Sequence, residues 1–303
     1  MADDQVKQDV RRFYDQIGWQ TESDGFYQNA RYEDLRPVSA SYIYKCHMRV
    51  NRHLIRPGHF LLDAGSGPIQ YPAYLTYGEE FAYRLCVDIS FLAMKEARKR
   101  LGNKGLYVVA DVANMPFISG VIDGLVSLHT LHHLPLAEQR KAYNEFDRLL
   151  AHGKVAVIVN GWTESRLMKR WAWLQRIMES AGAKISSSRR KNSERSAEEF
   201  PKSKPENGPS GKNKPQDKKV TGTFIEKLDA QWLRRELAEN DIQILVWRSV
   251  SVRFLRAVIH SVLAGKLLLA LLYMLEEKYP SYFGVNGQYP LVVFHKSESM
   301  DNR

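Results

Sequence analysis

The sequence predicts an α/β protein with a doubly wound, mostly parallel sheet that is covered by helices on both faces. Three apolar runs each end on an aspartate, at Asp63, Asp88 and Asp111. Helix-forming segments alternate with these runs, which is typical of parallel strands joined by helical crossovers. Because the carboxyl ends of such strands form the ligand crevice, we expect the three carboxylates to converge on one molecule.

The first apolar run leads into the turn Asp63-Ala64-Gly65-Ser66-Gly67. Leu61 and Leu62 suit a strand buried on both faces, and the glycines let the backbone approach a ligand where a Cβ would collide. Turns of this kind also bind dinucleotides and phosphates. Asp88 is placed to accept hydrogen bonds from ribose hydroxyls, Asp111 suits an exocyclic amine, and neither position offers a Lys or Arg for phosphate. The ligand implied is a nucleoside without a phosphate chain.

The other elements follow from periodicity and from turn residues. Helices are expected over residues 4–17 and 39–54, and they form a helical N-terminal cap over 1–56 ahead of a cofactor-binding α/β core over 57–180. Further helices are predicted over 91–101, 136–150, 165–180 and 230–239, the last with Asp229 as its N-cap. Strands are predicted over 83–88, 106–111, 121–128, 154–160, 242–247 and 289–295.

A fourth strand runs into Ser127-Leu128-His129-Thr130-Leu131-His132-His133. With Asp63-Ala64-Gly65-Ser66-Gly67, Asp88-Ile89-Ser90 and Ala110-Asp111-Val112, this segment resembles the class I S-adenosylmethionine-dependent methyltransferases. The most similar branch is the ubiquinone/menaquinone type, or methyltransferase type 11. The resemblance covers roughly residues 50–165. It implies a seven-stranded Rossmann-like sheet, with the last strand antiparallel between the fifth and sixth, and S-adenosyl-L-methionine as cofactor.

Carried over residue by residue, the resemblance implies a cofactor site. Gly65 and Gly67 would pass under the methionine moiety, Asp88 would hold the ribose hydroxyls, and Asp111 with Val112 would frame the adenine. The full set of expected cofactor-binding residues is Asp63, Ala64, Gly65, Ser66, Gly67, Tyr71, Asp88, Ile89, Ser90, Asp111, Val112, Ser127, Leu128 and His129. The family usually has a third glycine where this chain has Ile69, which leaves the backbone contacts of Ser66 to Gln70 open.

Candidate catalytic residues are His133, His129 and Tyr14. His129 is interpreted as a wall beside the sulfonium rather than a base. His132 and His133 are expected to open a helix, and His133 is favoured as a general base near neutral pH. Related enzymes place a tyrosine like Tyr14 over the cofactor as a lid. No metal is expected, because no carboxylate or cysteine near the three histidines completes a ligand set.

The net charge of +10 is unevenly distributed. Residues 184–219 hold eleven Lys or Arg against five Asp or Glu, a balance of +6. The segment 181–220, most clearly from Ser186 to Val220, is rich in polar residues, Pro and Gly, and predicts a disordered basic insertion. A solvated loop is the favoured interpretation of this segment, and an electrostatic tether to anionic lipid or RNA is the alternative. Since the rest of the chain is nearly balanced, no nucleic-acid partner is expected.

Residues 221–303 are expected to complete the core around an apolar helical insertion at 250–280. Within it Val252 to Leu275 is strongly apolar, but its uncharged runs are too short to span a bilayer. Two interpretations stay open: a packed lid or homodimer surface, or an interfacial helix over 250–275 that contacts the membrane peripherally. The N-terminus lacks a signal peptide and two cysteines form no pair-like spacing, so we expect a cytoplasmic protein, with peripheral membrane contact under the second interpretation.

These features predict methyl transfer from S-adenosylmethionine to a small or lipophilic acceptor by in-line displacement at the sulfonium. The sequence does not distinguish transfer of the methyl group to oxygen from transfer to nitrogen or to carbon. Two other functions remain as alternatives: a non-catalytic interaction module that keeps the cofactor fold, and a dinucleotide oxidoreductase. The oxidoreductase is disfavoured because its turn usually has three glycines.

Overall fold

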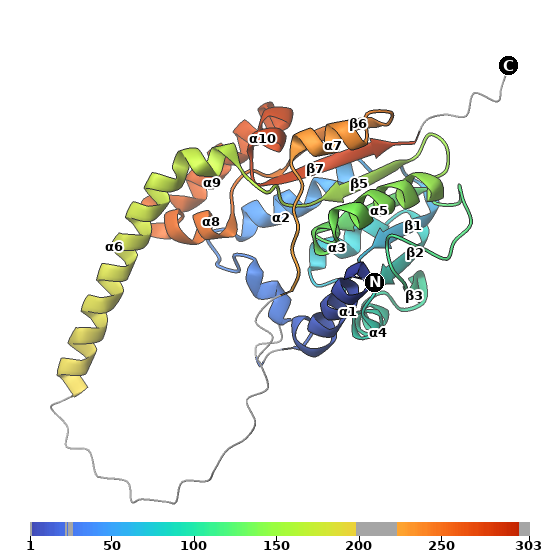
Figure 1. The fold of residues 1–303 in the computed structure, drawn as a ribbon. Helices are drawn as coiled ribbons and strands as arrows, with labels where there is room; N and C mark the ends of the chain where they lie inside the picture. Colours follow the sequence, from blue (N-terminus) through green and yellow to red (C-terminus); the bar gives the residue numbers. More distant parts are fainter. Residues whose placement is uncertain (1, 22, 24–26, 198–222, 297–303) are drawn as a thin grey trace, which may run out of the picture.

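The computed structural model describes residues 2–21, 23, 27–197 and 223–296 (Figure 1). Within these residues a seven-stranded sheet has the order β3-β2-β1-β4-β5-β7-β6. The first five strands are parallel, and β7 is antiparallel to both β5 and β6. The predicted fold class and the position of the last strand are therefore confirmed. The strands are β1 (Gly58–Ala64), β2 (Phe81–Asp88), β3 (Gly105–Val109), β4 (Gly124–Leu128), β5 (Val155–Val159), β6 (Asp241–Arg248) and β7 (Tyr289–His295).

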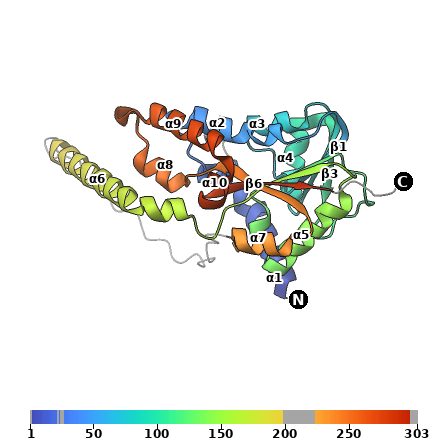
Figure 2. The ribbon, with the colours of Figure 1, turned by 90° about the horizontal axis from the view of Figure 1, so that it is seen from above.

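The sheet separates two hydrophobic clusters, because alternate side chains of each strand point to opposite faces. In β5, Val155, Val157 and Val159 belong to one cluster and Ala156 and Ile158 to the other. Helices cover both faces, as Figure 2 shows from above. On one face lie α2 (Ala40–Met48), α3 (Pro72–Leu75) and α4 (Phe91–Leu101), and on the other lie α5 (Leu136–Leu149) and α7 (Ala230–Glu236).

The N-terminal helix lies across the carboxyl ends of the parallel strands. Helix α1 (Ala2–Phe13) carries Val6, Val10 and Phe13 at helical spacing. Two aspartates in its first turn stabilise the helix, because their negative charges lie at the positive end of the helix dipole. A π-helical turn, Tyr14–Gly18, continues it. This segment places Tyr14 and the residues after it directly over the glycine turn that follows β1.

One predicted boundary is wrong. Helix α6 spans Arg166–Ala197, so residues 181–197, expected to belong to a disordered insertion, are helical (Figures 1 and 2). The prediction used the lack of apolar residues, which argues against a buried core but not against a local helix. Ala, Lys, Arg and Glu are all good helix formers. The rest of the expected insertion, 198–220, lies outside the described residues.

The apolar insertion is divided into separate helices rather than forming one continuous stretch. These are α8 (Val252–Val258), the 3-10 turn Ser261–Leu263 and α9 (Gly265–Lys278), and α10 (Pro280–Asn286) follows them. The chain changes direction before α9, where Ala264 has a positive φ of 53°. Glu276 fixes α9 to the core by accepting hydrogen bonds from the Tyr42 hydroxyl at 2.8 Å and from the Ser249 amide at 2.9 Å. Among the described residues, no helix is long and apolar enough to cross a membrane.

Candidate active site

The turn after β1 has the backbone geometry that glycine permits. Gly65 has a φ of 77° and Gly67 a φ of 54°, both in the left-handed region. A Cβ on Gly65 would lie 2.1 Å from the Thr130 hydroxyl oxygen, and one on Gly67 would lie 3.0 Å from ring carbons of Trp19. The side chains of Thr130 and Trp19 therefore approach the backbone of the two glycines too closely to leave room for a Cβ.

Ile69, which stands in place of a third glycine, keeps the glycine-like conformation. Its φ is 56°, which is strained for a β-branched residue, and its side chain is fully buried. The Arg100 guanidinium donates a 2.5 Å hydrogen bond to the Ile69 carbonyl. Isoleucine at this position therefore keeps the left-handed turn, because burial of its side chain and this hydrogen bond stabilise the conformation.

Asp88, at the end of β2, is buried directly beneath this turn. Its carboxylate accepts hydrogen bonds from the backbone N–H groups of Gly67 and Ser90, each at 2.9 Å. Burial raises the pKa of the Asp88 carboxyl to about 6, although these two hydrogen bonds act in the opposite direction. A carboxylate has about four acceptor sites, so Asp88 keeps capacity for the vicinal hydroxyls of a ribose.

Asp63 and Asp111 both reach the same cavity, but each carboxylate has a partner in the protein. Asp63 accepts two hydrogen bonds from the buried Arg84 guanidinium, at 2.5 and 3.0 Å. Asp111 forms an ion pair with Lys7 of α1, and Lys7 also pairs with Glu138. The sequence interpretation that no Lys or Arg accompanies Asp111 considered only neighbouring positions and missed Lys7.

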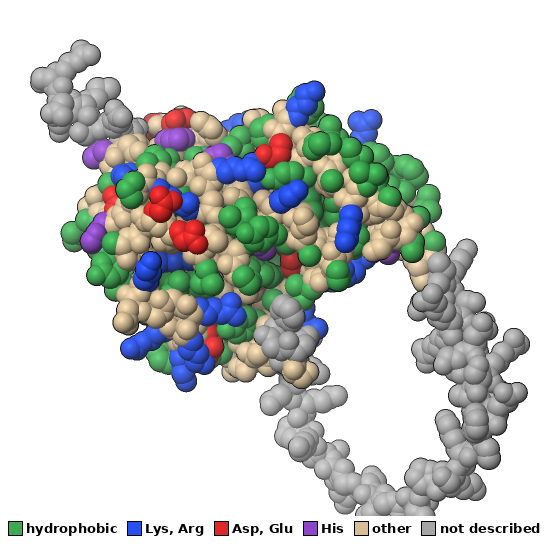
Figure 3. Space-filling model, turned by 180° about the vertical axis from the view of Figure 1, so that it is seen from behind, with side chains coloured by type: hydrophobic (Ala, Val, Ile, Leu, Met, Phe, Trp, Pro, Cys, Tyr) green, Lys and Arg blue, Asp and Glu red, His purple; other side chains and the backbone are tan. Residues whose placement is uncertain are grey.

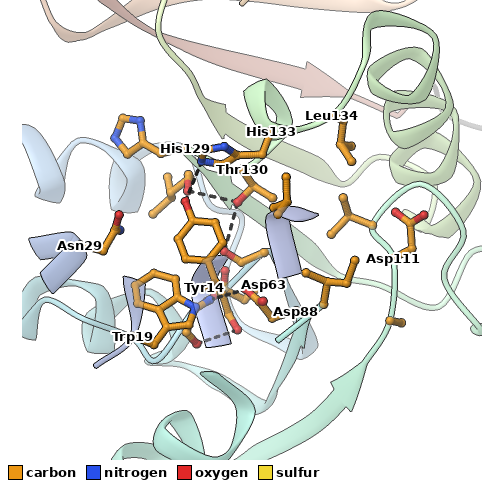
Figure 4. A pocket seen from close by; sticks show the side chains of 18 of the residues that line it. Tyr14, Trp19, Asn29, Asp63, Asp88, Asp111, His129, Thr130, His133 and Leu134 are labelled. Atoms are coloured by element: carbon orange, nitrogen blue, oxygen red, sulfur yellow. Dashed lines mark hydrogen bonds between the residues drawn. The ribbon is translucent and has the colours of Figure 1, made fainter. Parts of the chain in front are cut away.

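A cavity over the carboxyl ends of the strands collects most of the expected cofactor residues (Figure 4). It is lined by Asp63, Gly65, Ser66, Gly67, Asp88, Ile89, Asp111, Val112, Leu128 and His129. Four expected residues do not line this cavity and act elsewhere: Ala64, Tyr71, Ser90 and Ser127. The Ser127 hydroxyl joins β4 to β1 through the Ala64 carbonyl at 2.9 Å, and the Ser90 hydroxyl caps α4 by accepting from the Ala93 N–H at 3.1 Å.

His129 is a half-buried, neutral wall of this site. Its φ of 57° turns the ring toward Trp247 and Tyr289, with centroid distances of 4.9 and 5.6 Å. Burial, and then the positive charges of Arg248 and Lys227, lower the pKa of His129 to about 3. An uncharged ring is compatible with a neighbouring cation and is a poor proton acceptor, and the role of His129 as a wall beside the sulfonium stays a prediction.

Tyr14 and His133 form a hydrogen-bonded pair beside His129 (Figure 4). The Tyr14 hydroxyl lies 2.7 Å from His133 Nε2, and His133 Nδ1 lies 2.9 Å from the Phe224 carbonyl oxygen. Since the carbonyl only accepts, Nδ1 carries the proton and Nε2 accepts from Tyr14. Burial lowers the pKa of His133 and raises that of Tyr14, so both groups are neutral near pH 7.

The position of His133 corrects one sequence expectation. His132 and His133 do not open a helix but lie in a 3-10 turn, Leu131–His133, while α5 begins at Leu136. Pro135 separates the two, because the residue before a proline is disfavoured in the helical conformation. The described residues contain no group of three metal-ligating side chains, so the histidines have no completing ligand there.

A second and larger cavity, of about 590 Å³, adjoins the first. The two share six lining residues: Tyr14, Asn29, Gln70, Tyr74, His129 and His133. Tyr71, expected at the cofactor, lines this second cavity instead. Its hydroxyl points to the Ala30 carbonyl at 3.4 Å, and its ring packs on His47 at 4.9 Å.

An extended segment, Thr223 to Leu228, forms one side of the second cavity. We call it the strap. Its backbone accepts from the His133 ring and from the Gln139 amide, and the Glu226 N–H donates to the His132 carbonyl at 2.8 Å. The strap therefore holds both histidines and presents its own side chains to the cavity.

Sequence reasoning missed several lining residues of the first cavity. Trp19 stacks on Tyr14 at a centroid distance of 4.9 Å and covers Gly67, and the Thr130 hydroxyl donates to the Gly65 carbonyl at 3.1 Å. Thr130 lies within the segment Ser127 to His133, so the sequence pattern could have identified it. Trp19 and Lys7 come from the distant N-terminal segment, where no sequence pattern indicates a role in this cavity.

The sequence profile of a family described as a methyltransferase domain matches residues 62–158. These residues run from β1 through β5 and include the glycine turn, Asp88, Asp111 and the histidine segment. Residues 62–158 are thus a methyltransferase domain, and the Rossmann-like fold, the enzyme class and the cofactor S-adenosylmethionine that the sequence predicts agree with this match. The type 11 branch expected from the sequence is consistent with this family. A search of curated proteins found no relative that matches the chain.

Solved structures share the fold at low identity. Geranyl diphosphate C-methyltransferase from Streptomyces coelicolor, in complex with Mg²⁺, geranyl diphosphate and S-adenosyl-L-homocysteine, is 13% identical, with a TM-score of 0.52 over 96% of this chain and 98% of that one. Phosphoethanolamine N-methyltransferase 1 from Haemonchus contortus is 9% identical, with a TM-score of 0.56 over 100% of this chain and 51% of that one. The [4+2]-cyclase SpnF is 16% identical, with a TM-score of 0.50 over 97% and 98%. Because these three proteins are described with three different reactions, the shared fold does not specify the acceptor.

Proposed function

We propose that the protein transfers a methyl group from S-adenosylmethionine to a small or lipophilic acceptor held in the second cavity. The observation that carries this proposal is the junction of the two cavities at Tyr14, His129 and His133. The cofactor supplies an activated methyl group on its sulfonium, so the protein has to align the acceptor, exclude water and remove a proton where the acceptor requires it.

The residues of the first cavity fit the cofactor in chemical terms. Gly65 and Gly67 leave room under a methionine moiety, and Asp88 offers free acceptor sites to ribose hydroxyls. Asp111 and Val112 line the end of the cavity where an adenine would lie. The neutral ring of His129 lines both cavities, and it adds no charge repulsion beside a sulfonium.

Titration calorimetry with S-adenosylhomocysteine and with NADH tests this assignment. Binding of S-adenosylhomocysteine alone is expected. Binding of NADH alone would favour the oxidoreductase alternative, and binding of neither ligand would contradict the cofactor site. Transfer of labelled methyl to a metabolite extract then separates an enzyme from a non-catalytic module.

Proton removal is assigned to the Tyr14–His133 pair. An acceptor hydroxyl or acidic carbon would give its proton to the Tyr14 oxygen as the Tyr14 proton moves to His133 Nε2. The Phe224 carbonyl, 2.9 Å from Nδ1, would stabilise the resulting imidazolium. For an acceptor that needs no deprotonation, the same pair only positions it.

A Tyr14→Phe variant is expected to lower methyl transfer by about 100-fold while S-adenosylhomocysteine affinity changes by less than about threefold. The ring stays in place to stack on Trp19, and only the hydroxyl between acceptor and His133 is lost. The rate of methyl transfer is measured as incorporation of labelled methyl into the product found in the extract. Tyr44→Phe, at an exposed position on α2, is the control. Unchanged transfer by Tyr14→Phe would remove the pair from the mechanism.

Helix α9 supports membrane contact, the second interpretation of the apolar insertion. Its outer face is unusually apolar: Leu267 is 61% exposed and Met274 59%, and Val262 just before it is 91% exposed. Lysine and arginine side chains lie among the hydrophobic ones on this end of the molecule (Figure 3). An apolar face bordered by cations suits the interface of an anionic bilayer, where a lipophilic acceptor would be found.

The protein is expected to float with vesicles of phosphatidylcholine and phosphatidylserine at low salt. The double variant Leu267→Glu, Leu271→Glu places two charges on the exposed face and should abolish flotation without loss of fold. Ile118→Glu, 75% exposed elsewhere on the molecule, is the matched control and should float like the wild type. If the wild type does not float, the exposed apolar face of α9 is explained by a packed lid or by a dimer surface instead. A dimer in analytical ultracentrifugation would then favour the dimer surface.

A further inference from the structure

We propose that the second cavity selects acceptors that carry one carboxylate, and that Lys227 of the strap is its partner. This inference rests on the proposed function, because it specifies the acceptor of that same site. It follows from the charges, the unpartnered donors and the apolar surfaces that line the cavity.

Lys227 brings an ammonium group to the cavity wall close to the reaction centre. Its Nζ lies 3.3 Å from the position of a Cβ on Gly161, and the Tyr289 ring lies 3.5 Å from that same point. His129 contacts this tyrosine ring edge-on, at a centroid distance of 5.6 Å. The positive charge of Lys227 contributes to the low pKa of both His129 and His132, which places it near both histidines.

Lys227 differs from the other cations of the cavity because no carboxylate in the described residues pairs with it. Arg248 is bound to Glu33 at 2.5 Å, and Arg253 to Glu179 at 2.8 Å. The Lys227 side chain is half-buried, and burial lowers the pKa of its ammonium. An ammonium removed from water without a counterion is a ready partner for an anion.

Two further donors at this cavity have no partner among the described residues. The Arg248 Nε and the Thr223 hydroxyl are both buried without a hydrogen bond. Thr223 and Lys227 come from the two ends of the strap, and both residues line the second cavity with Arg248. Buried donors are normally satisfied, so two unpaired buried donors beside the unpaired Lys227 ammonium indicate that this cavity takes an acceptor group.

The remainder of the cavity suits an apolar body. Phe13, Tyr32, Tyr71, Tyr74 and Tyr289 present aromatic rings to it. A volume of about 590 Å³ is within the range of pockets that enclose small organic molecules. The acceptor class is therefore a ring-bearing or chain-bearing acid, with the acid at Lys227 and the reactive atom toward Tyr14 and His129.

The charge balance favours one negative charge over a diphosphate. After the two ion pairs, the described lining residues retain one positive charge, on Lys227. The Streptomyces coelicolor neighbour is described in complex with Mg²⁺ and geranyl diphosphate. The described residues of this chain contain no cluster of three metal-ligating side chains that could hold a divalent cation beside a diphosphate.

The experiment compares each acid with its uncharged amide. Benzoate, cinnamate and octanoate are titrated against benzamide, cinnamamide and octanamide in the presence of saturating S-adenosylhomocysteine. At least one acid is expected to bind the wild type about tenfold more tightly than its amide, because a charge-assisted hydrogen bond is lost in the amide. In Lys227→Met this preference should fall below about threefold, with amide binding retained.

Two further variants make the outcome specific. Thr223→Val removes only a hydroxyl and should reduce the preference by about threefold. Lys104→Met, at an exposed position outside the cavity, should leave the preference unchanged. Phenyl phosphate serves as the competing arm, and tighter binding of it than of every carboxylate would overturn the assignment.

Failure of this inference can be told apart from failure of the proposed function. If the wild type does not bind S-adenosylhomocysteine, the proposed function itself fails. If it binds that ligand and no acid binds better than its amide, only the carboxylate assignment is wrong. A preference that survives in Lys227→Met with S-adenosylhomocysteine affinity intact would likewise exclude Lys227.

Discussion

Replacement of Asp88 by asparagine is expected to weaken S-adenosylhomocysteine binding by about 100-fold, because hydrogen bonds to a charged acceptor contribute about 1.5–3 kcal/mol each. The asparagine amide has one acceptor oxygen, while the two backbone N–H groups of Gly67 and Ser90 already need acceptors. One of these N–H groups would face an NH₂ group, and the ribose hydroxyls would lose their partner. Titration calorimetry measures the change, and an affinity within threefold of the wild type would exclude Asp88 from the site.

The pH dependence of binding provides an internal control for Asp88. Burial raises its pKa to about 6, so the unliganded fold favours the protonated carboxyl. The contribution of Asp88 to the folding free energy is greatest below pH 3.8, the ordinary pKa of an aspartate carboxyl, and it is lost as the pH rises through about 6. Ligand binding has the opposite sign, because ribose hydroxyls donate to the ionised form. Wild-type affinity should fall about tenfold from pH 8 to pH 5, and Asp88→Asn should show no such fall.

The cofactor half of the site was largely predictable from the sequence for a physical reason. Parallel strands all present their carboxyl ends at one edge, so chain order alone brings Gly65, Asp88 and Asp111 together. The family profile over residues 62–158 covers this same half. Ile69 was a doubtful position in the sequence, and the structure shows that burial can hold an isoleucine where glycine is usual.

The acceptor half was not predictable, because its parts come from segments far apart in the chain. Tyr14 arrives from the N-terminal helix, Lys227 from the strap and Arg248 from β6. No periodicity links these positions, and each alone has the composition of an ordinary surface or core residue. The distribution of partners among charges, which distinguishes Lys227 from Arg248, is visible only once the side chains are placed.

The partner of Asp63 gives the second large effect. Arg84→Met is expected to lower the free energy of unfolding by about 3–5 kcal/mol, because it leaves a buried carboxylate without its counterion. The Asp63 and Arg84 side chains are 4% and 2% exposed, and the methionine replaces only the apolar part of the arginine. Urea unfolding followed by circular dichroism measures the loss.

The double variant Asp63→Asn, Arg84→Met separates charge from packing in this buried pair. Asparagine removes the unpaired charge, so the double variant should be more stable than Arg84→Met alone, although both have lost the ion pair. Lys99→Met breaks the exposed pair with Glu96 and should change the unfolding free energy by less than about 0.5 kcal/mol. If Arg84→Met were as stable as Lys99→Met, the ion pair beneath the glycine turn would not be what holds Asp63 in place. The carboxylate of Asp63 would then be available to the ligand, as the sequence alone had suggested.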